Sequence, residues 1–353
     1  MFDIAVLTQG FAGLHVLDAL LLRAPCAIRI TVIGVSRAGG NGVNLEGEVA
    51  SRQFAALAEF PEISIRFAKG TAAARSADLT IITLGEEDLS DLSDHHSDRP
   101  SPDAVSAHHD CDAAAILKAK LVRQAVRSLY EMSYDGLMLI LDNPVDILTT
   151  VAQTTAAEAT HDDSITKRIF GIGTAVSTDQ FRSILADRLN VSKDDVGAFV
   201  IGERGQIEIP CWSSVTVAQT PLHHYYPNGK RTLTVRDRVT IFEKMRAATL
   251  KRDAHGGTSQ LVDALTCARI VRAIANNEKR VFAVSVPQSH FRSDADCDDH
   301  GPCSFSRPAV IGRSGILRMI EEFPMNENEE LALAECARSV RARYRKVIQR
   351  CDA

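Results

Sequence analysis

The stretch Gly136-Leu137-Met138-Leu139-Ile140-Leu141-Asp142-Asn143-Pro144-Val145-Asp146 passes from an apolar run of strand length into a segment compatible with a helix. It ends a series of similar runs, separated by helix-compatible segments, and the earlier runs are Asp3–Leu7, Arg29–Val35, Ser64–Phe67 and Leu79–Thr83. Runs of this length and spacing indicate β-α-β units. Because repeated β-α-β order implies a parallel sheet, we predict an α/β fold with a doubly wound parallel sheet.

The pattern becomes mixed after Asn143. Strands are expected near Gly197–Ile201 and Ile207–Trp212, and long helices over Val235–Ala254 and Asn326–Gln349. We therefore divide the chain into an N-terminal α/β domain, residues 1–150, and an α+β domain, residues 151–353. Within the first domain, residues 86–112 are dense in Asp, Ser, Pro and His and precede a helix that is expected to begin near Ala113. So polar a connection predicts an enlarged lid loop.

The turn after the first predicted strand carries a partial phosphate-binding pattern. Thr8-Gln9-Gly10-Phe11-Ala12-Gly13 fits G-x-G-x-x-G with Thr8 in place of the first glycine. In this pattern Gly10 lets the backbone approach a pyrophosphate and Gly13 allows close packing of helix and strand, while the helix N-terminus favours the anion. The N-terminal domain is therefore predicted to bind a dinucleotide through residues 10–13. The alternative is a plain tight turn whose two glycines adopt positive φ.

The end of the second predicted strand indicates which dinucleotide is preferred. The position of the acid that usually binds both ribose hydroxyls is taken by Gly34. Its absence removes repulsion against a 2′-phosphate, and Ser36 and Arg37 supply a hydroxyl and a guanidinium to bind one. NADP(H) is therefore favoured over NAD(H). The alternative is that Arg37 is a solvated loop residue and that no nucleotide binds.

From Ile4 to about Ile348 the chain resembles the lactate/malate dehydrogenase family. The resemblance rests on the common order of its motifs, which are Thr83-Leu84-Gly85, Asn143-Pro144-Val145-Asp146, Gly171-Ile172-Gly173-Thr174, Phe181-Arg182, Gly202-Glu203-Arg204-Gly205-Gln206, Pro210-Cys211-Trp212-Ser213, Gly256-Gly257-Thr258-Ser259 and Arg307-Pro308-Ala309-Val310-Ile311-Gly312. It implies a Rossmann-type sheet followed by a substrate domain, with cofactor contacts at residues 83–85. It also implies that Asn143 contacts substrate and nicotinamide and that Thr258 lies beside the reacting carbon.

The catalytic residues of that family do not carry over. By the resemblance, Arg204 stands at the position of the catalytic His, Ser177 at that of its Asp partner and Gln180 at that of the Arg that anchors a substrate carboxylate. The lid Arg position falls near Cys111, although Arg99 from the enlarged lid is able to re-enter the site. A guanidinium stays protonated, so Arg204 cannot give and take a proton as imidazole does.

A permanent cation at residue 204 needs compensation. Without the His, an Asp at residue 177 would be an unpaired carboxylate in a dry pocket, so its replacement by Ser is physically consistent. The charge of Arg204 is balanced either by a bound anion or by an ion pair, for which Asp179 and Glu203 are near in sequence.

Several other residues are of the types that bind metal ions or donate protons. The lid holds Asp94-His95-His96-Ser97-Asp98 and His108-His109-Asp110-Cys111-Asp112, and the C-terminal half holds Cys297, His300 and Cys303. Adjacent His side chains do not easily reach one ion, and such loops are usually only hydrophilic, so no metal site is predicted. His223-His224-Tyr225-Tyr226 and His255 border the cleft in the family, and a surface or packing role is the simpler interpretation for each.

Composition excludes several other classes of protein. The formal net charge of −5, with Lys and Arg scattered, gives no footprint for nucleic acid. The longest apolar runs fall far short of the roughly 20 residues that span a bilayer, and no cationic leader is seen. Eight scattered Cys without a CxxC pair favour reduced thiols. We expect a cytoplasmic protein and, by the resemblance, a homo-oligomer, either dimer or tetramer.

Two functions follow as hypotheses. The first is an NADP(H)-dependent oxidoreductase of a small molecule that is not a 2-keto acid. Its substrate would carry an imine or a conjugated double bond. This follows because Gln180 stands where the Arg that anchors a carboxylate is expected. The alternative is a catalytically inactive pseudo-dehydrogenase that serves as a nucleotide-binding or protein-interaction scaffold. A sensor that responds to NADPH cannot be separated from the alternative by sequence.

Overall fold

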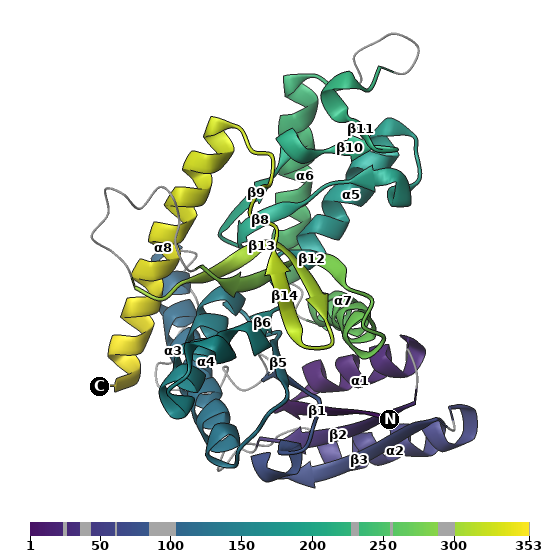
Figure 1. Cartoon of the computed structure of the whole chain (residues 1–353), viewed down its shortest axis with the longest axis vertical. Helices are drawn as coiled ribbons and strands as arrows, with labels where there is room; N and C mark the ends of the chain where they lie inside the picture. The colour runs from purple at the N-terminus through teal and green to yellow at the C-terminus, as the bar shows by residue number, and fades with distance from the viewer. Residues whose placement is uncertain are drawn as a thin grey trace.

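A computed structural model describes residues 1–23, 27–35, 44–60, 62–84, 104–226, 233–254, 257–288 and 301–352 (Figure 1). The N-terminal part consists of β1 (Phe2–Thr8), α1 (Phe11–Arg23), β2 (Ile28–Gly34), α2 (Leu45–Glu59), β3 (Ile63–Lys69), η1 (Thr71–Ala74), β4 (Leu79–Thr83), α3 (Ala104–Glu131), β5 (Leu137–Ile140), α4 (Val145–Thr160), η3 (Asp163–Arg168) and β6 (Ile169–Gly171). This is the β-α-β alternation that the apolar runs predict.

The C-terminal part mixes short strands with long helices. It consists of α5 (Ala175–Leu189), η4 (Lys193–Asp195), β7 (Val196–Gly197), β8 (Val200–Glu203), β9 (Ile207–Pro210), η5 (Trp212–Ser214), β10 (Thr216–Val217), β11 (Thr220–Pro221), η6 (Leu222–His224), α6 (Val235–Ala254), α7 (Gly257–Ala275), β12 (Arg280–Pro287), β13 (Ser304–Gly312), β14 (Gly315–Met319) and α8 (Glu327–Asp352).

One sheet runs through both parts in the order β3-β2-β1-β4-β5-β6-β12-β13-β8-β9, with β14 paired to β13. Strands β1 to β6 are parallel, whereas β12, β13, β8 and β9 pair antiparallel. The doubly wound sheet is confirmed. Helix α4 crosses residues 150 and 151, and the division of the chain at that point stays a prediction.

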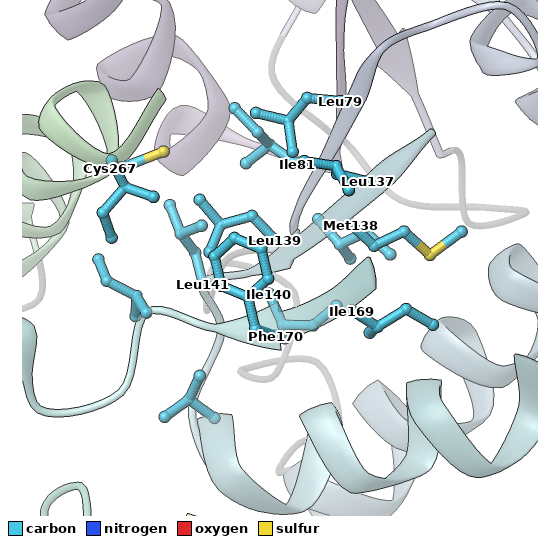
Figure 2. Packing of buried hydrophobic residues seen from close by; sticks show 14 of the residues in the cluster. Leu79, Ile81, Leu137, Met138, Leu139, Ile140, Leu141, Ile169, Phe170 and Cys267 are labelled. Carbon is cyan, nitrogen blue, oxygen red and sulfur yellow. The ribbon is translucent and has the colours of Figure 1, made fainter. Parts of the chain in front are cut away.

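Helices cover both faces of the sheet. Helix α1 packs against α7, while α3, α4 and α8 pack together in a separate group (Figure 1). Between the layers, β4, β5 and β6 are fully buried, and Figure 2 shows their apolar side chains, among them Leu79, Leu139 and Phe170, stacked in one core. A second core lies in the C-terminal part, where Phe181 and Leu185 of α5 pack with Met245 of α6.

Helix α3 corrects the predicted lid. It begins at Ala104, so residues 104–112 are helical and not part of a loop of residues 86–112. Pro102 stands just before this start, and proline is compatible with the beginning of a helix but not with its interior. Polar composition was misleading here because the solvated face of a helix is also polar. The rest of the predicted lid, residues 86–103, lies outside the described residues.

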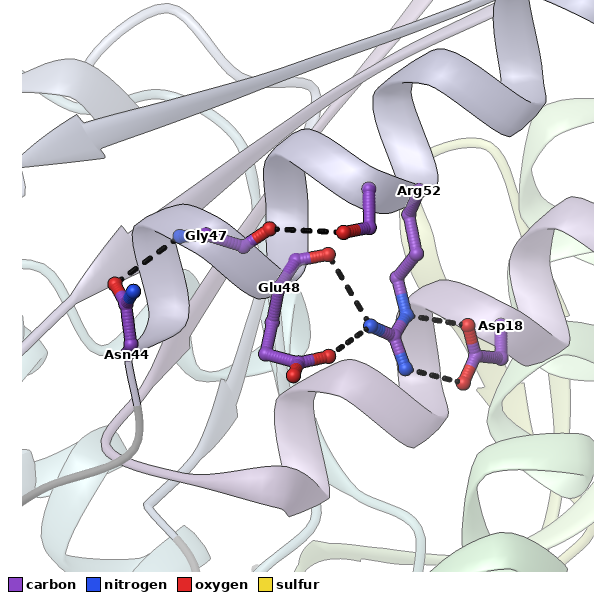
Figure 3. Close-up of polar contacts among 6 residues, drawn as sticks. Asp18, Asn44, Gly47, Glu48 and Arg52 are labelled. Carbon is purple, nitrogen blue, oxygen red and sulfur yellow. Dashed lines mark hydrogen bonds and ion pairs between the residues drawn. The ribbon is translucent and has the colours of Figure 1, made fainter.

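Helix α2 is fixed to α1 by charged groups (Figure 3). Arg52 donates to both carboxylate oxygens of Asp18, at 2.6 and 3.0 Å, and to Glu48 at 2.8 Å. The Asn44 side chain caps the first turn by accepting from the Gly47 amide. These contacts hold the start of α2 beside the carboxyl end of β2. In the part of the chain that is described, no helix is long and apolar enough to cross a membrane.

Candidate functional site

The turn between β1 and α1 is closed by Thr8. This fully buried residue uses its hydroxyl to donate to the Gly10 carbonyl and to accept from the Gly10 amide, at 3.2 and 3.3 Å. A Cβ added at Gly13 would lie 2.5 Å from the Thr8 Cβ, so the helix packs on the strand only because Gly13 has no side chain. Neither Gly10 nor Gly13 has a positive φ. The alternative of a turn with two left-handed glycines is therefore wrong.

The N-terminus of α1 is suited to an anion. Its first turn, which starts with Phe11 and Ala12, holds no acidic side chain. The Nε2 of Gln9, just before the helix, is buried without an acceptor among the described residues. Helix N-termini and unspent N–H donors bind phosphate groups. These features fit the pyrophosphate of a dinucleotide.

The end of β2 has no room for a long acidic side chain without movement. A Cβ at Gly34 would lie 3.3 Å from the Phe67 ring, which is tighter than ordinary contact. Lys69 is the partner of Gly34 in the β2–β3 register, and its side chain is 81% exposed and lies 3.7 Å from Glu46. Sequence reasoning missed Lys69, because only strand register places it beside Gly34. Ser36 and Arg37 lie outside the described residues.

The carboxyl ends of β4 and β5 are joined by Asp142. The Leu84 amide donates to the Asp142 carboxylate, and the Lys118 ammonium of α3 lies 3.7 Å from the other oxygen of that carboxylate. Lys118 and Asp142 are both buried. Thr83 and Leu84, at the end of β4, thus lie beside the end of β5 that Asn143 follows, whereas Gly85 lies outside the described residues.

Asn143 follows this junction directly. Its backbone carbonyl accepts from Lys118 Nζ at 3.3 Å, and its side-chain Oδ1 is buried without a donor among the described residues. An unsatisfied buried amide oxygen is costly unless a ligand supplies the missing hydrogen bond. The Asn143 Oδ1 is therefore available to accept a hydrogen bond from a ligand. Thr258 lies in α7, with its side chain outside the described residues.

Arg204 is buried, and its charge is balanced by an acid of α7. Its Nη2 donates to both oxygens of Asp263, at 2.7 and 2.8 Å, and its backbone amide donates to Asp146 at 2.8 Å. The side chains of Arg204 and Asp263 are 1% and 13% exposed. A cation at this depth requires such a partner. Arg204 is therefore held in a buried ion pair in which one nitrogen contacts both oxygens of Asp263.

The acids expected to pair with Arg204 are engaged elsewhere, so that prediction is wrong. Asp179 pairs with Arg269 at 2.6 Å and with Lys193 at 3.7 Å, and Glu203 pairs with Arg343 of α8. Neighbours in sequence on β8 and on α5 do not face the guanidinium. Only the packing of α7 across the site reveals the partner.

Two acids near Arg204 are held mainly in apolar surroundings. Burial is the largest cause that raises the pKa of Asp146 to about 7, against the hydrogen bond from the Arg204 amide, which lowers it. Burial also raises the pKa of Glu203, and the Arg343 charge opposes that shift. A desolvated carboxylate disfavours its charged form.

Ser177 is connected to the turn that carries Arg204. Its hydroxyl is fully buried and donates to Glu208 Oε1 at 2.7 Å. The same oxygen accepts from the Gly205 amide at 3.2 Å, and Gly205 adopts a φ of 78°, which favours glycine. The Glu208 carboxylate, which sequence reasoning did not single out, thus joins Ser177 to the turn that carries Arg204.

Gln180 lines a cavity of about 400 Å³ between α5 and α7. Its Oε1 is buried without a donor in the described part of the molecule. The walls combine apolar and charged groups, including Val176, Asp179, Val262, Leu265 and Arg269. A neutral amide, not a guanidinium, therefore stands at the position of the carboxylate anchor.

The remaining candidates give little chemistry. Cys111 lies in α3, and its side chain is outside the described residues. The described residues also leave out Arg99, the first His cluster of the lid, His255, Cys297 and His300. The rings of His223 and His224 contact each other at 4.2 Å on η6. Among the described residues, no group of three or more His, Cys, Asp or Glu is arranged to hold a metal ion. The five described cysteines are free thiols, and Cys303 is buried.

Comparisons with known proteins agree with this architecture. Residues 174–350 match the family model described as lactate/malate dehydrogenase, alpha/beta C-terminal domain. L-lactate dehydrogenase 2 of Bacillus cereus is 32% identical over 216 residues, which are 61% of this chain and 64% of that protein, less than two thirds of its length. L-lactate dehydrogenase of Kosmotoga olearia is 25% identical over 350 residues, 98% of this chain and 96% of its own.

Solved structures show the same fold over nearly the whole chain. A lactate dehydrogenase from a Medee basin deep-sea metagenome library has a TM-score of 0.78 at 21% identity and covers 98% of both chains. The lactate dehydrogenase of Cryptosporidium parvum, solved with lactic acid and nicotinamide adenine dinucleotide, has a TM-score of 0.76 at 17% identity, with 98% of both chains covered. At these identities the likeness shows the fold alone.

Proposed function

Because the chain belongs to the lactate/malate dehydrogenase family, we propose that it is an NADP(H)-dependent oxidoreductase whose substrate is neither lactate nor malate. The observation that carries the proposal is the Arg204–Asp263 pair at the position of the catalytic His. A buried guanidinium in a bidentate pair does not exchange protons near pH 7. Arg204 therefore cannot supply the proton transfer by which the family reduces 2-keto acids, while the crevice at the strand ends still offers groups that suit a dinucleotide.

The dinucleotide, when bound, supplies or accepts the hydride. The residues of this chain orient the reactants: Gln9 and the α1 N-terminus face the pyrophosphate, and Asn143 offers an amide oxygen with no partner of its own among the described residues. Placement contributes much of the rate of a hydride transfer. The crevice therefore supports an active oxidoreductase more than a passive surface.

The substrate follows from Gln180. A neutral amide gives up the bidentate hydrogen bonds by which a guanidinium holds a carboxylate. The neutral Gln180 amide therefore suits an uncharged substrate better than a carboxylate. We propose a cyclic imine or a conjugated carbonyl compound as the substrate class.

Cofactor preference follows from Gly34 and its surroundings. No acid stands at residue 34, and Lys69 is beside it in the sheet register. Together with Ser36 and Arg37 in the following segment, this favours a 2′-phosphate. Titration of NADPH and NADH against the fluorescence of Trp212, the one Trp of the chain, measures the preference. We expect tighter binding of NADPH; equal affinities would contradict the cofactor assignment.

Two variants divide the contacts to the 2′-phosphate. Arg37→Ala and Lys69→Ala should each weaken NADPH about 5- to 50-fold and leave NADH unchanged, as expected for the loss of one charge-assisted contact of about 1–2 kcal/mol. Lys167→Ala, an exposed residue before β6, is the matched control and should change neither affinity. A variant whose NADPH affinity does not move has no contact with the 2′-phosphate.

Oxidation and reduction are then tested directly. Consumption of NADPH is followed with pyruvate, oxaloacetate, 1-pyrroline and 2-cyclohexen-1-one. We expect turnover of one of the last two and none of the keto acids. Robust turnover of pyruvate by the unaltered chain would overturn the substrate proposal. The triple variant Arg204→His, Ser177→Asp, Gln180→Arg should gain some pyruvate reduction if the pocket is otherwise that of the family.

One observation favours a second candidate. Near the site, Arg204 bonds to Asp263 and Thr8 bonds to Gly10, so both side chains occupy space there through contacts within the protein. An inactive scaffold that binds a nucleotide or a partner protein would show NADPH binding without turnover of any substrate. We further propose that the chain forms a homo-oligomer, which light scattering after gel filtration measures.

A further inference from the structure

A buried ion pair stands at the edge of the sheet where the nicotinamide end of a cofactor would lie. Lys118 is 5% exposed and Asp142 is 7% exposed, and their charged groups are 3.7 Å apart. The pair lies at the carboxyl ends of β4 and β5, beside Asn143. Ligands of open α/β sheets bind at these strand ends. Burial of an ammonium is costly, so its retention at this place calls for an explanation.

The sequence signal for Lys118 is its position on α3. The buried stripe of this helix includes Ala115, Ala119, Val122 and Val126, and Lys118 lies within that stripe. A lysine there points its stem along the core and its ammonium towards Asn143. Because the ordinary place of Lys is the solvated face, this placement is not a consequence of helix formation.

The ammonium retains hydrogen-bonding capacity. Of its three N–H groups, one donates to the Asn143 carbonyl at 3.3 Å. The Asp142 oxygen at 3.7 Å balances the charge but lies beyond hydrogen-bonding distance. The neighbouring Asn143 Oδ1 also lacks a partner among the described residues. Donor capacity and an unmet acceptor thus lie side by side at the proposed reaction site.

We propose that Lys118 is the proton donor of the reduction, in place of the His that Arg204 replaces. This inference rests on the proposed function. When bound, the cofactor would supply the hydride, to the carbon of a C=N group or to the β-carbon of a conjugated carbonyl compound. An N–H bond of the Lys118 ammonium breaks, and its proton passes to the heteroatom. The neutral amine then regains a proton from water. Asp142 holds the ammonium in place through charge.

Arginine separates proton donation from a merely structural cation. Lys118→Arg keeps a positive charge beside Asp142 but offers a group that does not deprotonate. We expect Lys118→Arg to retain NADPH affinity within threefold and to lose turnover of the best substrate among 1-pyrroline and 2-cyclohexen-1-one by at least about 100-fold. Lys118→Met should lose at least as much. Lys167→Met is the control and should retain full turnover.

Retention of a third or more of the turnover in Lys118→Arg, with loss in Lys118→Met, would overturn the proposal and leave a structural ion pair. If Lys118→Arg does not fold, chemical rescue replaces it. Lys118→Ala should regain turnover with added methylamine or ethylamine, and the gain should follow the basicity of the amine. Absence of rescue in a folded Lys118→Ala variant also overturns the proposal.

A second measurement does not depend on turnover. Lysines are methylated with formaldehyde and a borane reductant, and modification is quantified by peptide mass with and without saturating NADPH. NADPH should protect Lys118 at least about fivefold and leave Lys167 unchanged. Binding of NADPH without protection of Lys118 overturns the proton-donor assignment alone. Absence of NADPH binding, or bound NADPH without turnover in the unaltered chain, overturns the proposed function and the proton donor with it.

Discussion

The crevice at the ends of β1, β4 and β5 and the pocket around Arg204 have diverged in different ways. In the crevice, donors and acceptors such as Gln9 Nε2 and Asn143 Oδ1 stay without protein partners among the described residues. In the pocket, two of the residues assigned to catalytic positions bond to other side chains, Arg204 to Asp263 of α7 and Ser177 to Glu208, while Gln180 Oε1 lacks a donor among the described residues. We call the region around Arg204 and Ser177 the closed pocket, and its contrast with the crevice supports the proposal that cofactor binding was kept while the acid/base chemistry was replaced.

The largest test of this contrast is Asp263→Ala. It leaves Arg204 as a buried charge without its bidentate partner, and we expect a loss of about 3–5 kcal/mol in the free energy of unfolding, measured with urea. Asp187→Ala, an exposed residue on α5, is the control and should cost less than about 0.5 kcal/mol. The double variant Arg204→Met, Asp263→Leu should recover most of the stability. A harmless Asp263→Ala would mean that the pocket is not closed by this pair.

Asp146 gives the closed pocket a dependence on pH. Because folding raises its pKa to about 7, the neutral acid is favoured in the folded state. The stability from this group is present below about pH 4, its pKa in the unfolded chain, and is lost as pH rises through 7. Between pH 4 and 8, Asp146→Asn should remove a decline of about 2–4 kcal/mol in the free energy of unfolding. Parallel pH profiles of the two proteins would show that Asp146 is charged in the folded state.

Gly13→Ala tests the crevice. The added Cβ would lie 2.5 Å from the Thr8 Cβ, so the helix or the strand must move, at an expected cost of about 1–3 kcal/mol. Gly47→Ala is the comparison: its Cβ meets only the movable end of the Asn44 side chain, so at most the helix cap, about 1 kcal/mol, is lost. Thr8→Gly should rescue Gly13→Ala in the double variant. Additive effects of the two substitutions, measured by urea unfolding, would contradict direct contact.

The smallest effect is expected for Ser177→Ala, of about 1 kcal/mol, because Glu208 keeps its bond from the Gly205 amide. Ser183→Ala, on the same helix, removes only a hydroxyl bonded to the backbone carbonyl of Asp179 and should change stability less. Equal losses in the two variants would show that Ser177 is no more than a helix surface residue.

Many of the strands and helices could be predicted because they depend on short-range patterns in the sequence. The apolar runs that became β1 to β5 and the helix Val235–Ala254 depend on local periodicity, and the sequence placed them within a few residues. Helix α3 was predicted too short, because a polar start on a helix reads as a loop. The assignment of Arg204, Ser177 and Gln180 to catalytic positions rests on the family resemblance and stays a prediction.

Partners across the fold required the tertiary structure. The sequence by itself determined a doubly wound sheet, a glycine that must pack closely at residue 13 and a guanidinium where a proton carrier is expected. That Arg204 pairs with Asp263, and that Lys118 meets Asp142 and Asn143, was decided only when α7 and α3 packed on the site. Charges attract over a few ångströms irrespective of their separation along the chain, so packing of the helices, not spacing in the sequence, selects the pairs.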